Sequence, residues 1–167
     1  MNILLTNPNY KHTWILALHL YRSGHCVYCL SKSKVNFLYF SRFVKKIIIV
    51  NSFSKNDYKA ACKKYLIDLV IPVGFEENLN ISRYSDDQQL HQITNTPGLE
   101  KIILASDKYK ITTYVSNIGA LVPKTFRVND IAFDKDNIFE NKTFFIKPSK
   151  EGLIKKYFII RNHNDLN

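Results

Sequence analysis

The stretch Asp68-Leu69-Val70-Ile71-Pro72-Val73 is apolar at every position after its first residue. Three earlier stretches, residues 2–6, 26–30 and 47–50, share this continuous apolar pattern. A strand that is apolar on both sides has both faces buried, which is typical of parallel sheets. The sequence therefore predicts a parallel sheet in the first half of the chain, with strands near residues 3–6, 26–30, 47–50 and 69–73.

Two of the three segments between these strands have the features of helices, whereas the segment between residues 30 and 47 is a polar, aromatic-rich loop. Residues 10–23 carry apolar side chains at helical spacing, and Gly24 suits the left-handed position that follows a helix. Ser54 is a suitable N-cap for a second helix. Right-handed crossovers then predict an α/β fold with a Rossmann-like sheet and helices on both faces. The first turn, Thr6-Asn7-Pro8-Asn9-Tyr10, lacks the glycines of a dinucleotide site, so we expect neither NAD nor FAD there.

The composition is strongly basic. The 167 residues include 24 Lys and Arg against 14 Asp and Glu, a formal net charge of +10. Such a charge attracts nucleic acid, an anionic membrane surface or nucleotide phosphates. The cations stand in scattered pairs, such as Lys45-Lys46 and Lys63-Lys64, which is typical of a solvated surface. No apolar run approaches the ~18 residues of a membrane span, so we expect no membrane partner.

The cysteines and histidines indicate neither a metal site nor a catalytic group. Cys26, Cys29 and Cys62 are few and odd in number, which favours a reducing compartment, and we expect a cytoplasmic location. Cys26 and Cys29 fall in a predicted strand, where positions three apart point to opposite faces, so we interpret both as core residues. The five histidines show no ligand spacing and no nucleophile partner. We assign no catalytic residue in this chain.

The turn Thr96-Pro97-Gly98 is interpreted as the boundary between two domains, residues 1–97 and 98–167. Beyond it, the sequence predicts helices at residues 99–105 and 107–117, with Ser106 as the N-cap of the second. Residues 144–160 are predicted to form an antiparallel hairpin. A hairpin cannot bury all of its large apolar residues, so we expect either a mobile segment or association with another chain. The residues concerned are Phe144, Phe145, Tyr157, Phe158 and Ile159.

The nonapeptide Phe144-Phe145-Ile146-Lys147-Pro148-Ser149-Lys150-Glu151-Gly152 carries the strongest functional signal. An apolar strand leads into a lysine, proline prevents further pairing, and a charged loop with one glycine follows. A lysine at the end of a strand can hold a phosphate as a point charge. Lys-Pro after a strand is more often only a strand end, but Ala105-Ser106-Asp107-Lys108 opens a helix upstream and supplies a second lysine.

Taken in order, these segments resemble the ATP-grasp superfamily, which includes D-alanine–D-alanine ligase, biotin carboxylase and the carbamoyl-phosphate synthase large subunit. Residues 1–97 resemble its Rossmann-like pre-ATP-grasp domain. Residues 105–108, followed by Gly119-Ala120-Leu121-Val122-Pro123-Lys124-Thr125, are similar to its Asp-Lys helix and "G-x-x-x-P-x-T" segment. Residues 145–152 are similar to its "V-x-K-P-x-x-x-G" strand and lid.

The resemblance implies a set of site residues. Lys108 and Lys147 would contact the phosphates of ATP, and Ser149, Glu151 and Gly152 would belong to the lid that closes over them. This lid has fewer glycines than is usual in the family. The Mg²⁺ that the family uses is expected, but its ligands, like the adenine-binding strand, lie C-terminal to where this chain ends. The last residues would therefore form an incomplete α+β subdomain.

Glu76 and Glu77 follow the carboxyl end of a parallel strand, where ligands of α/β proteins bind. They are candidates for substrate binding. Acidic residues are also common at helix N-termini, where they interact favourably with the helix dipole, so that explanation remains open.

The leading hypothesis is the N-terminal portion of an ATP-dependent carboxylate ligase, which forms an acyl phosphate that an amine or other nucleophile captures. We expect the chain to be inactive alone, and to be completed by a second polypeptide or to self-associate. Whether it is an enzyme by itself is left open. The alternative is a non-catalytic basic α/β module that binds nucleotides or nucleic acid. Nucleic acid is the weaker partner, because the glycine, aromatic and basic pattern of RNA-binding strands is absent.

Overall fold

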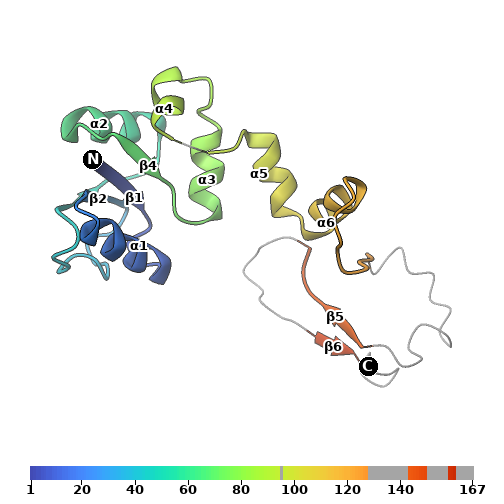
Figure 1. Ribbon diagram of the computed structural model, residues 1–167. Helices are drawn as coiled ribbons and strands as arrows, with labels where there is room; N and C mark the ends of the chain where they lie inside the picture. The colour runs from blue at the N-terminus through green and yellow to red at the C-terminus, as the bar shows by residue number, and fades with distance from the viewer. Residues whose placement is uncertain (95, 128–142, 150–157, 161–167) are drawn as a thin grey trace. The chain divides into compact units, whose positions relative to one another are not determined.

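The computed structural model describes residues 1–94, 96–127, 143–149 and 158–160 (Figure 1). The chain divides into two compact units, Met1–Ile102 and Ile103–Asn167, and each is considered by itself. The domain boundary predicted at residues 97 and 98 stays a prediction. Within the described residues, no helix has both the length and the apolar character needed to cross a bilayer.

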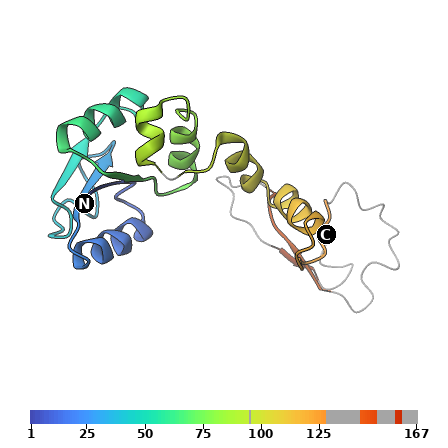
Figure 2. The same cartoon turned by 45° about the horizontal axis from the view of Figure 1, so that its top comes forward.

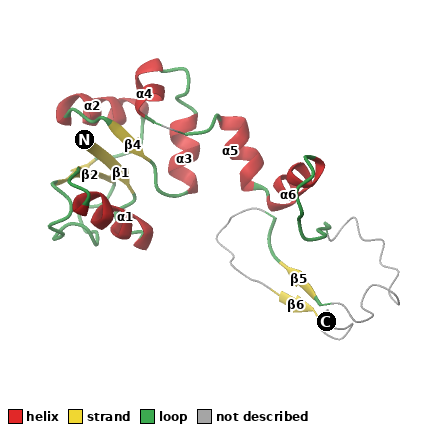
Figure 3. Ribbon diagram, viewed as in Figure 1, coloured by secondary structure: helices red, strands yellow, loops and turns green. Residues whose placement is uncertain are grey.

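The first unit is built on a parallel sheet of four strands in the order β3-β2-β1-β4. The strands are β1 (Asn2–Thr6), β2 (Cys26–Ser31), β3 (Lys46–Ile49) and β4 (Leu69–Ile71). The central strand, β1, pairs in parallel on both sides, so that Leu4 lies opposite Tyr28 on β2 and Val70 on β4. The predicted parallel sheet is therefore confirmed. Helices follow β1, β3 and β4 in the chain, whereas β2 leads to β3 through a connection without a helix (Figure 3).

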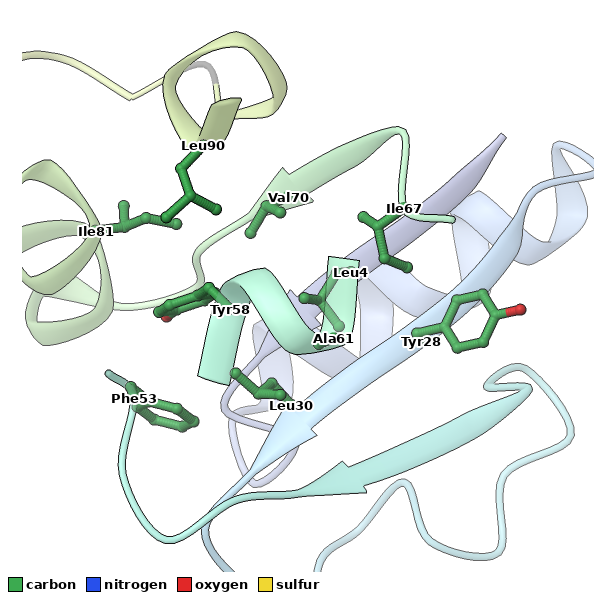
Figure 4. Close-up of a cluster of buried hydrophobic side chains, with 10 residues drawn as sticks. All are labelled: Leu4, Tyr28, Leu30, Phe53, Tyr58, Ala61, Ile67, Val70, Ile81 and Leu90. Carbon is green, nitrogen blue, oxygen red and sulfur yellow. The ribbon is translucent and has the colours of Figure 1, made fainter. Parts of the chain in front are cut away.

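Helices cover both faces of this sheet (Figure 2). The helix α1 (Lys11–Arg22) packs on one face, where Ala17 contacts a cluster with Ile3 and Val27. The helices α2 (Lys55–Tyr65), α3 (Phe75–Ser82) and α4 (Gln88–Ile93) contribute to the cluster on the other face. Side chains alternate along each strand, so neighbouring positions of β1 and β2 enter opposite clusters. Figure 4 shows the second cluster, which consists of Leu4, Tyr28, Leu30, Phe53, Tyr58, Ala61, Ile67, Val70, Ile81 and Leu90.

The end of β4 differs from the prediction. The strand ends at Ile71 and not at residue 73, because Pro72 has no N–H to donate to the ladder. The backbone N–H of Val73 instead donates to the hydroxyl of Thr6, at 2.8 Å. This bond keeps the chain beside the end of β1 after regular pairing has stopped.

Local helix signals are mostly confirmed. Gly24 takes the left-handed conformation after α1, with φ of 80°. Ser54 caps α2 and forms a capping box in which its hydroxyl accepts from the Asp57 N–H at 3.2 Å. The α4 helix, which the sequence did not predict, is capped by Asp87. The Asp87 carboxylate also binds the ammonium groups of Lys59 at 3.0 Å and Lys55 at 3.4 Å.

Two sequence interpretations are wrong. Cys26 is exposed at the start of β2, and only Cys29 lies in the core. Ser106 is the last residue of α5 (Leu99–Ser106) and not the N-cap of the next helix. The N-cap of α6 (Lys108–Asn117) is Asp107, whose carboxylate accepts from the N–H groups of Tyr109 and Lys110. A carboxylate accepts two such bonds more strongly than a hydroxyl does.

The second unit contains α6 and an antiparallel pair of strands, β5 (Phe144–Ile146) and β6 (Phe158–Ile160). The predicted antiparallel pairing is confirmed for these residues. Ile160 is buried, whereas Phe145, Phe158 and Ile159 are more than half exposed. The pair therefore leaves large apolar side chains uncovered, as the sequence predicts. Tyr157 and the connection at residues 150–157 lie outside the described residues.

The capping box of α2 gives a test of the fold. We expect Ser54→Ala to lower the free energy of unfolding by about 1 kcal/mol, because the Asp57 N–H loses the hydroxyl that accepts its hydrogen bond. Chemical denaturation of the purified chain measures this loss. Ser52→Ala is the matched control, because Ser52 gives only an exposed hydrogen bond to the same Asp57 carboxylate. An equal loss in both variants would show that the cap is not the source of the stability.

Candidate functional site

The carboxyl ends of the parallel strands meet at one edge of the sheet, where a pocket of about 210 Å³ opens. Two segments that line it follow directly after β1 and β2. The strand order reverses between β1 and β4, and ligands of open α/β sheets bind beside such a reversal. The pocket therefore lies where a parallel sheet is best suited to hold a ligand. Its lining residues are Asn7, Pro8, Asn9, Ser31, Lys32, Ser33, Phe53 and Glu77.

The turn after β1 holds Asn7 in the left-handed region, with φ of 52°. Asparagine accepts this conformation more readily than most residues other than glycine do. The Asn7 side-chain amide donates to the Val73 carbonyl at 2.7 Å, and the Thr13 hydroxyl donates to the Asn7 carbonyl at 2.7 Å. Asn7 thus connects the ends of β1 and β4 and the first turn of α1.

The turn after β4 depends on Gly74, which has φ of 106° and precedes α3. A Cβ at this position would lie 2.8 Å from the Glu77 Oε2 atom and 2.8 Å from the Tyr10 ring. Both separations are shorter than atomic contact allows. Glycine is therefore required both for the backbone conformation and for the place that the Glu77 carboxyl occupies.

Glu77 lies in the first turn of α3 and is only 6% exposed. Its Oε2 atom has no hydrogen-bond partner within the described part of the chain. Burial raises the pKa of the Glu77 carboxyl, although the helix backbone, the Asn7 amide and Lys32 oppose part of the effect. A buried carboxyl oxygen without a partner costs free energy unless a ligand supplies one, and such groups cluster at functional sites.

The structure separates the two predicted substrate residues. Both lie in the first turn of α3, so the alternative explanation, acidic residues at a helix N-terminus, also applies to this position. Glu76 is exposed and does not line the pocket, whereas Glu77 does. The sequence could not make this distinction, because it depends on which side of α3 faces the end of the sheet.

The first unit contains a second buried polar group, the hydroxyl of Tyr58. This atom also lacks a hydrogen-bond partner among the residues that the structure describes. Burial raises the pKa of Tyr58, and the charge of Glu77 raises it further. Tyr58 comes from α2 and packs beside Phe53, with ring centroids 6.3 Å apart (Figure 4).

Lys32 is a lining residue that the sequence analysis missed. It follows β2, and its ammonium group lies 4.9 Å from the centroid of the Phe53 ring. The signal was available, because a charged residue directly after an apolar parallel strand falls at the carboxyl edge of the sheet. The pocket therefore combines an acidic group, Glu77, with a basic one.

In the second unit, the segments that contain Lys108 and Lys147 meet. The backbone N–H of Lys108 donates to the Ser149 carbonyl at 2.8 Å, which joins the start of α6 to the segment after β5. Hydrogen bonds from the N–H groups of Lys110 and Tyr109 lower the pKa of Asp107, so its carboxylate holds this helix start in place. The two lysines, 39 positions apart in the sequence, thus belong to neighbouring segments.

The lysine side chains are available to a ligand. Lys147 and Ser149 are exposed, and Lys108 is half-buried. Among the described residues, neither lysine forms an ion pair. Glu151 and Gly152, the other predicted lid residues, lie outside the described residues. Within those residues, no three His, Cys, Asp or Glu side chains are grouped so as to hold a metal ion.

Comparison with solved structures finds proteins of the same fold. The chain matches N5-carboxyaminoimidazole ribonucleotide synthetase from Thermotoga maritima with a TM-score of 0.65 and 17% identity, over 99% of this chain and 42% of the synthetase. L-amino acid ligase from Bacillus licheniformis gives a TM-score of 0.62 and 12% identity, over 99% and 40% of the two chains. The biotin carboxylase domain of a single-chain bacterial carboxylase gives 0.50 and 12%, over 75% and 31%.

These structures are ATP-grasp ligases, and the likeness shows that the chain shares their fold. The chain spans about two fifths of the length of the synthetase and of the amino acid ligase. No model of a protein family matches the sequence, and no curated protein matches it.

The buried carboxyl predicts a pH dependence of stability. The folded-state pKa of Glu77 lies above its ordinary value of 4.5, so the native protein holds this proton more tightly than the unfolded chain does. The stability that Glu77 contributes is therefore complete below pH 4.5 and is lost as the pH rises through the folded-state pKa. We expect Glu77→Gln to raise the free energy of unfolding by about 1 kcal/mol at pH 7 relative to its effect at pH 4.

Denaturant titrations at both pH values measure this difference. Glu76→Gln is the control, because Glu76 lies on the same helical turn and is exposed. A pH-independent effect of Glu77→Gln would mean that the carboxyl is charged and satisfied in the folded protein.

Proposed function

We propose that the chain supplies the first domain and the first phosphate-binding residues of an ATP-dependent ligase of the ATP-grasp type. Such a ligase activates a carboxylate with ATP and joins it to an amine or another nucleophile. The proposal is supported by the fold shared with the synthetase, the amino acid ligase and the biotin carboxylase domain. Those proteins share few residues with this chain, so the site must carry the rest of the argument.

The observation that carries the proposal is the hydrogen bond from the Lys108 N–H to the Ser149 carbonyl, at 2.8 Å. It joins the two lysine-bearing segments that the family resemblance pairs. Two ammonium groups without acidic partners in the described chain would stabilise the negative charge of phosphate oxygens. When bound, ATP supplies the phosphoryl group that activates the carboxylate. Lys108 and Lys147 hold and orient its phosphates, and the Ser149 segment covers them.

The pocket at the sheet edge is the proposed site for the acceptor. Glu77 has an unsatisfied oxygen there and would accept a hydrogen bond from an amine or a hydroxyl of the substrate. Lys32 lies on the same pocket and would pair with an anionic group. An acceptor that carries both an N–H donor and an anionic group fits this pair of charges best.

We expect the chain to bind ATP weakly, with a Kd in the millimolar range that corresponds to about 4 kcal/mol. Lys108→Gln and Lys147→Gln should each weaken this binding about fivefold or more, because each removes a cation from the phosphates. Isothermal titration calorimetry of the whole chain with ATP measures the effect. Lys110→Gln is the control, since Lys110 is an exposed lysine on the same helix.

The ATP titrations distinguish a specific phosphate site from general attraction by a basic surface. If all three variants bound ATP as tightly as the unaltered chain, the phosphate-binding role of the lysine pair would be rejected. Micromolar affinity in the unaltered chain would show that its ATP site is far more complete than we propose. An ATP affinity that Lys110→Gln lowers as much as the others would indicate general attraction by a basic surface, as expected for a non-catalytic module.

A further inference from the structure

The acidic and basic residues are distributed unevenly along the chain. Residues 1–56 contain no Asp or Glu and eight Lys or Arg residues. They include the first three strands, α1, and the connection between β2 and β3. The surface that these residues form is therefore positive, and among them it has no acidic side chain to offset the cations.

The most exposed apolar side chains of this surface lie in the connection at residues 35–40, called here the aromatic loop. Phe40 is 95% exposed, Val35 is 85% exposed and Phe37 is 77% exposed. Single exposed apolar residues are ordinary, but four within six positions are not; Tyr39 is the fourth. Lys34 and Arg42 flank the loop on its two sides.

The loop is held in this arrangement by its own hydrogen bonds. The Tyr39 N–H donates to the Asn36 carbonyl at 3.2 Å, and the Ser41 N–H donates to the Leu38 carbonyl at 3.0 Å. The Leu38 N–H donates to the Asn36 side-chain oxygen at 3.2 Å, and the Leu38 side chain is buried against the cluster beneath α1. One apolar residue thus anchors the loop, while its neighbours on both sides point into solvent.

The first helix extends the same surface. Trp14 on α1 is partly exposed, and its ring lies 6.0 Å from that of Phe43, which follows the loop. Arg42 lies over the Phe43 ring at 5.8 Å. Figure 1 shows α1 and the connection between β2 and β3 on the same side of the sheet.

We propose that the aromatic loop is a docking surface for an anionic lipid bilayer, which it contacts without crossing. Apolar side chains at the tip would enter the boundary between headgroups and acyl chains, and the flanking cations would contact anionic headgroups. Trp and Tyr beside the loop suit the headgroup level. A nucleic acid fits less well, because the aliphatic Val35 offers neither a stacking face nor a hydrogen bond to a base. The expectation of no membrane partner was based on the absence of a membrane-spanning run, and contact with a bilayer surface needs no such run. The proposal therefore replaces that expectation.

Co-sedimentation of the full chain with lipid vesicles tests the proposal. We expect binding to vesicles of 70% phosphatidylcholine and 30% phosphatidylserine to exceed binding to pure phosphatidylcholine by about tenfold, and to fall at 0.5 M NaCl. Phe40→Ser should lower the partition coefficient about tenfold. Leu66→Asn is the matched control, because Leu66 is 75% exposed elsewhere on the unit and its positive φ suits asparagine. Circular dichroism verifies that both variants fold.

The contribution of the flanking cations to vesicle binding is tested with two double variants. Lys34→Gln combined with Arg42→Gln should reduce binding to the anionic vesicles. Lys63→Gln combined with Lys110→Gln removes the same charge from exposed positions elsewhere and should leave most of the vesicle binding intact. Equal loss in the two double variants would overturn the localised contact.

Parallel measurements test two other partners for the aromatic loop, a nucleic acid and a second copy of the chain. Absence of vesicle binding together with a gel shift of a single-stranded oligonucleotide that Phe40→Ser abolishes would overturn the proposal in favour of nucleic acid. Absence of vesicle binding with a dimer in light scattering that Phe40→Ser dissociates would overturn it in favour of a second copy of the chain. ATP binding enters neither experiment, so these outcomes are independent of the proposed ligase role.

Discussion

The parallel pairing of β1 with a strand on each side is the constraint on which the first unit depends. Leu4 and its neighbours are buried on both faces of the sheet, so every segment that leaves a strand must return over one face or the other. This places the helices in two layers and brings the strand ends to one edge. The pocket with Asn7 and Glu77 exists because that edge collects the turns after β1 and β4.

Much of the fold follows from sequence patterns because its signals are local and repeated. The apolar strands, the capping box at Ser54 and the glycine after α1 act within a few residues, so they can be recognised without the tertiary structure. The short helix α4 was not predicted, because it has only six residues and its N-cap Asp87 is also bound by Lys55 and Lys59 of α2, about 30 positions earlier in the chain. Such a contact between elements leaves no local pattern to read.

The candidate sites also combine features that local sequence patterns predict with features that depend on contacts between distant segments. Lys108 and Lys147 were predicted as site residues because each stands in a recognisable segment, and the bond to Ser149 could not be foreseen from either one. The position of the two glutamates after a strand can be read from the sequence, but only the rotation of α3 distinguishes Glu77 from Glu76. Burial without a partner is a property of the packed molecule, and so is the raised pKa of Glu77.

Gly74 has a consequence for how sequence variation at this turn should be interpreted. Its left-handed backbone and its closeness to the Glu77 carboxyl are two separate reasons for excluding a side chain. A library of substitutions scored by protein abundance would mark position 74 as a folding position, and one scored by ligand binding would mark it as a contact. Gly74 is not among the residues that line the pocket. A low score for substitutions at position 74 would instead reflect how closely the backbone approaches the Glu77 carboxyl. Loss of folding and loss of binding therefore cannot be distinguished at this position from such scores.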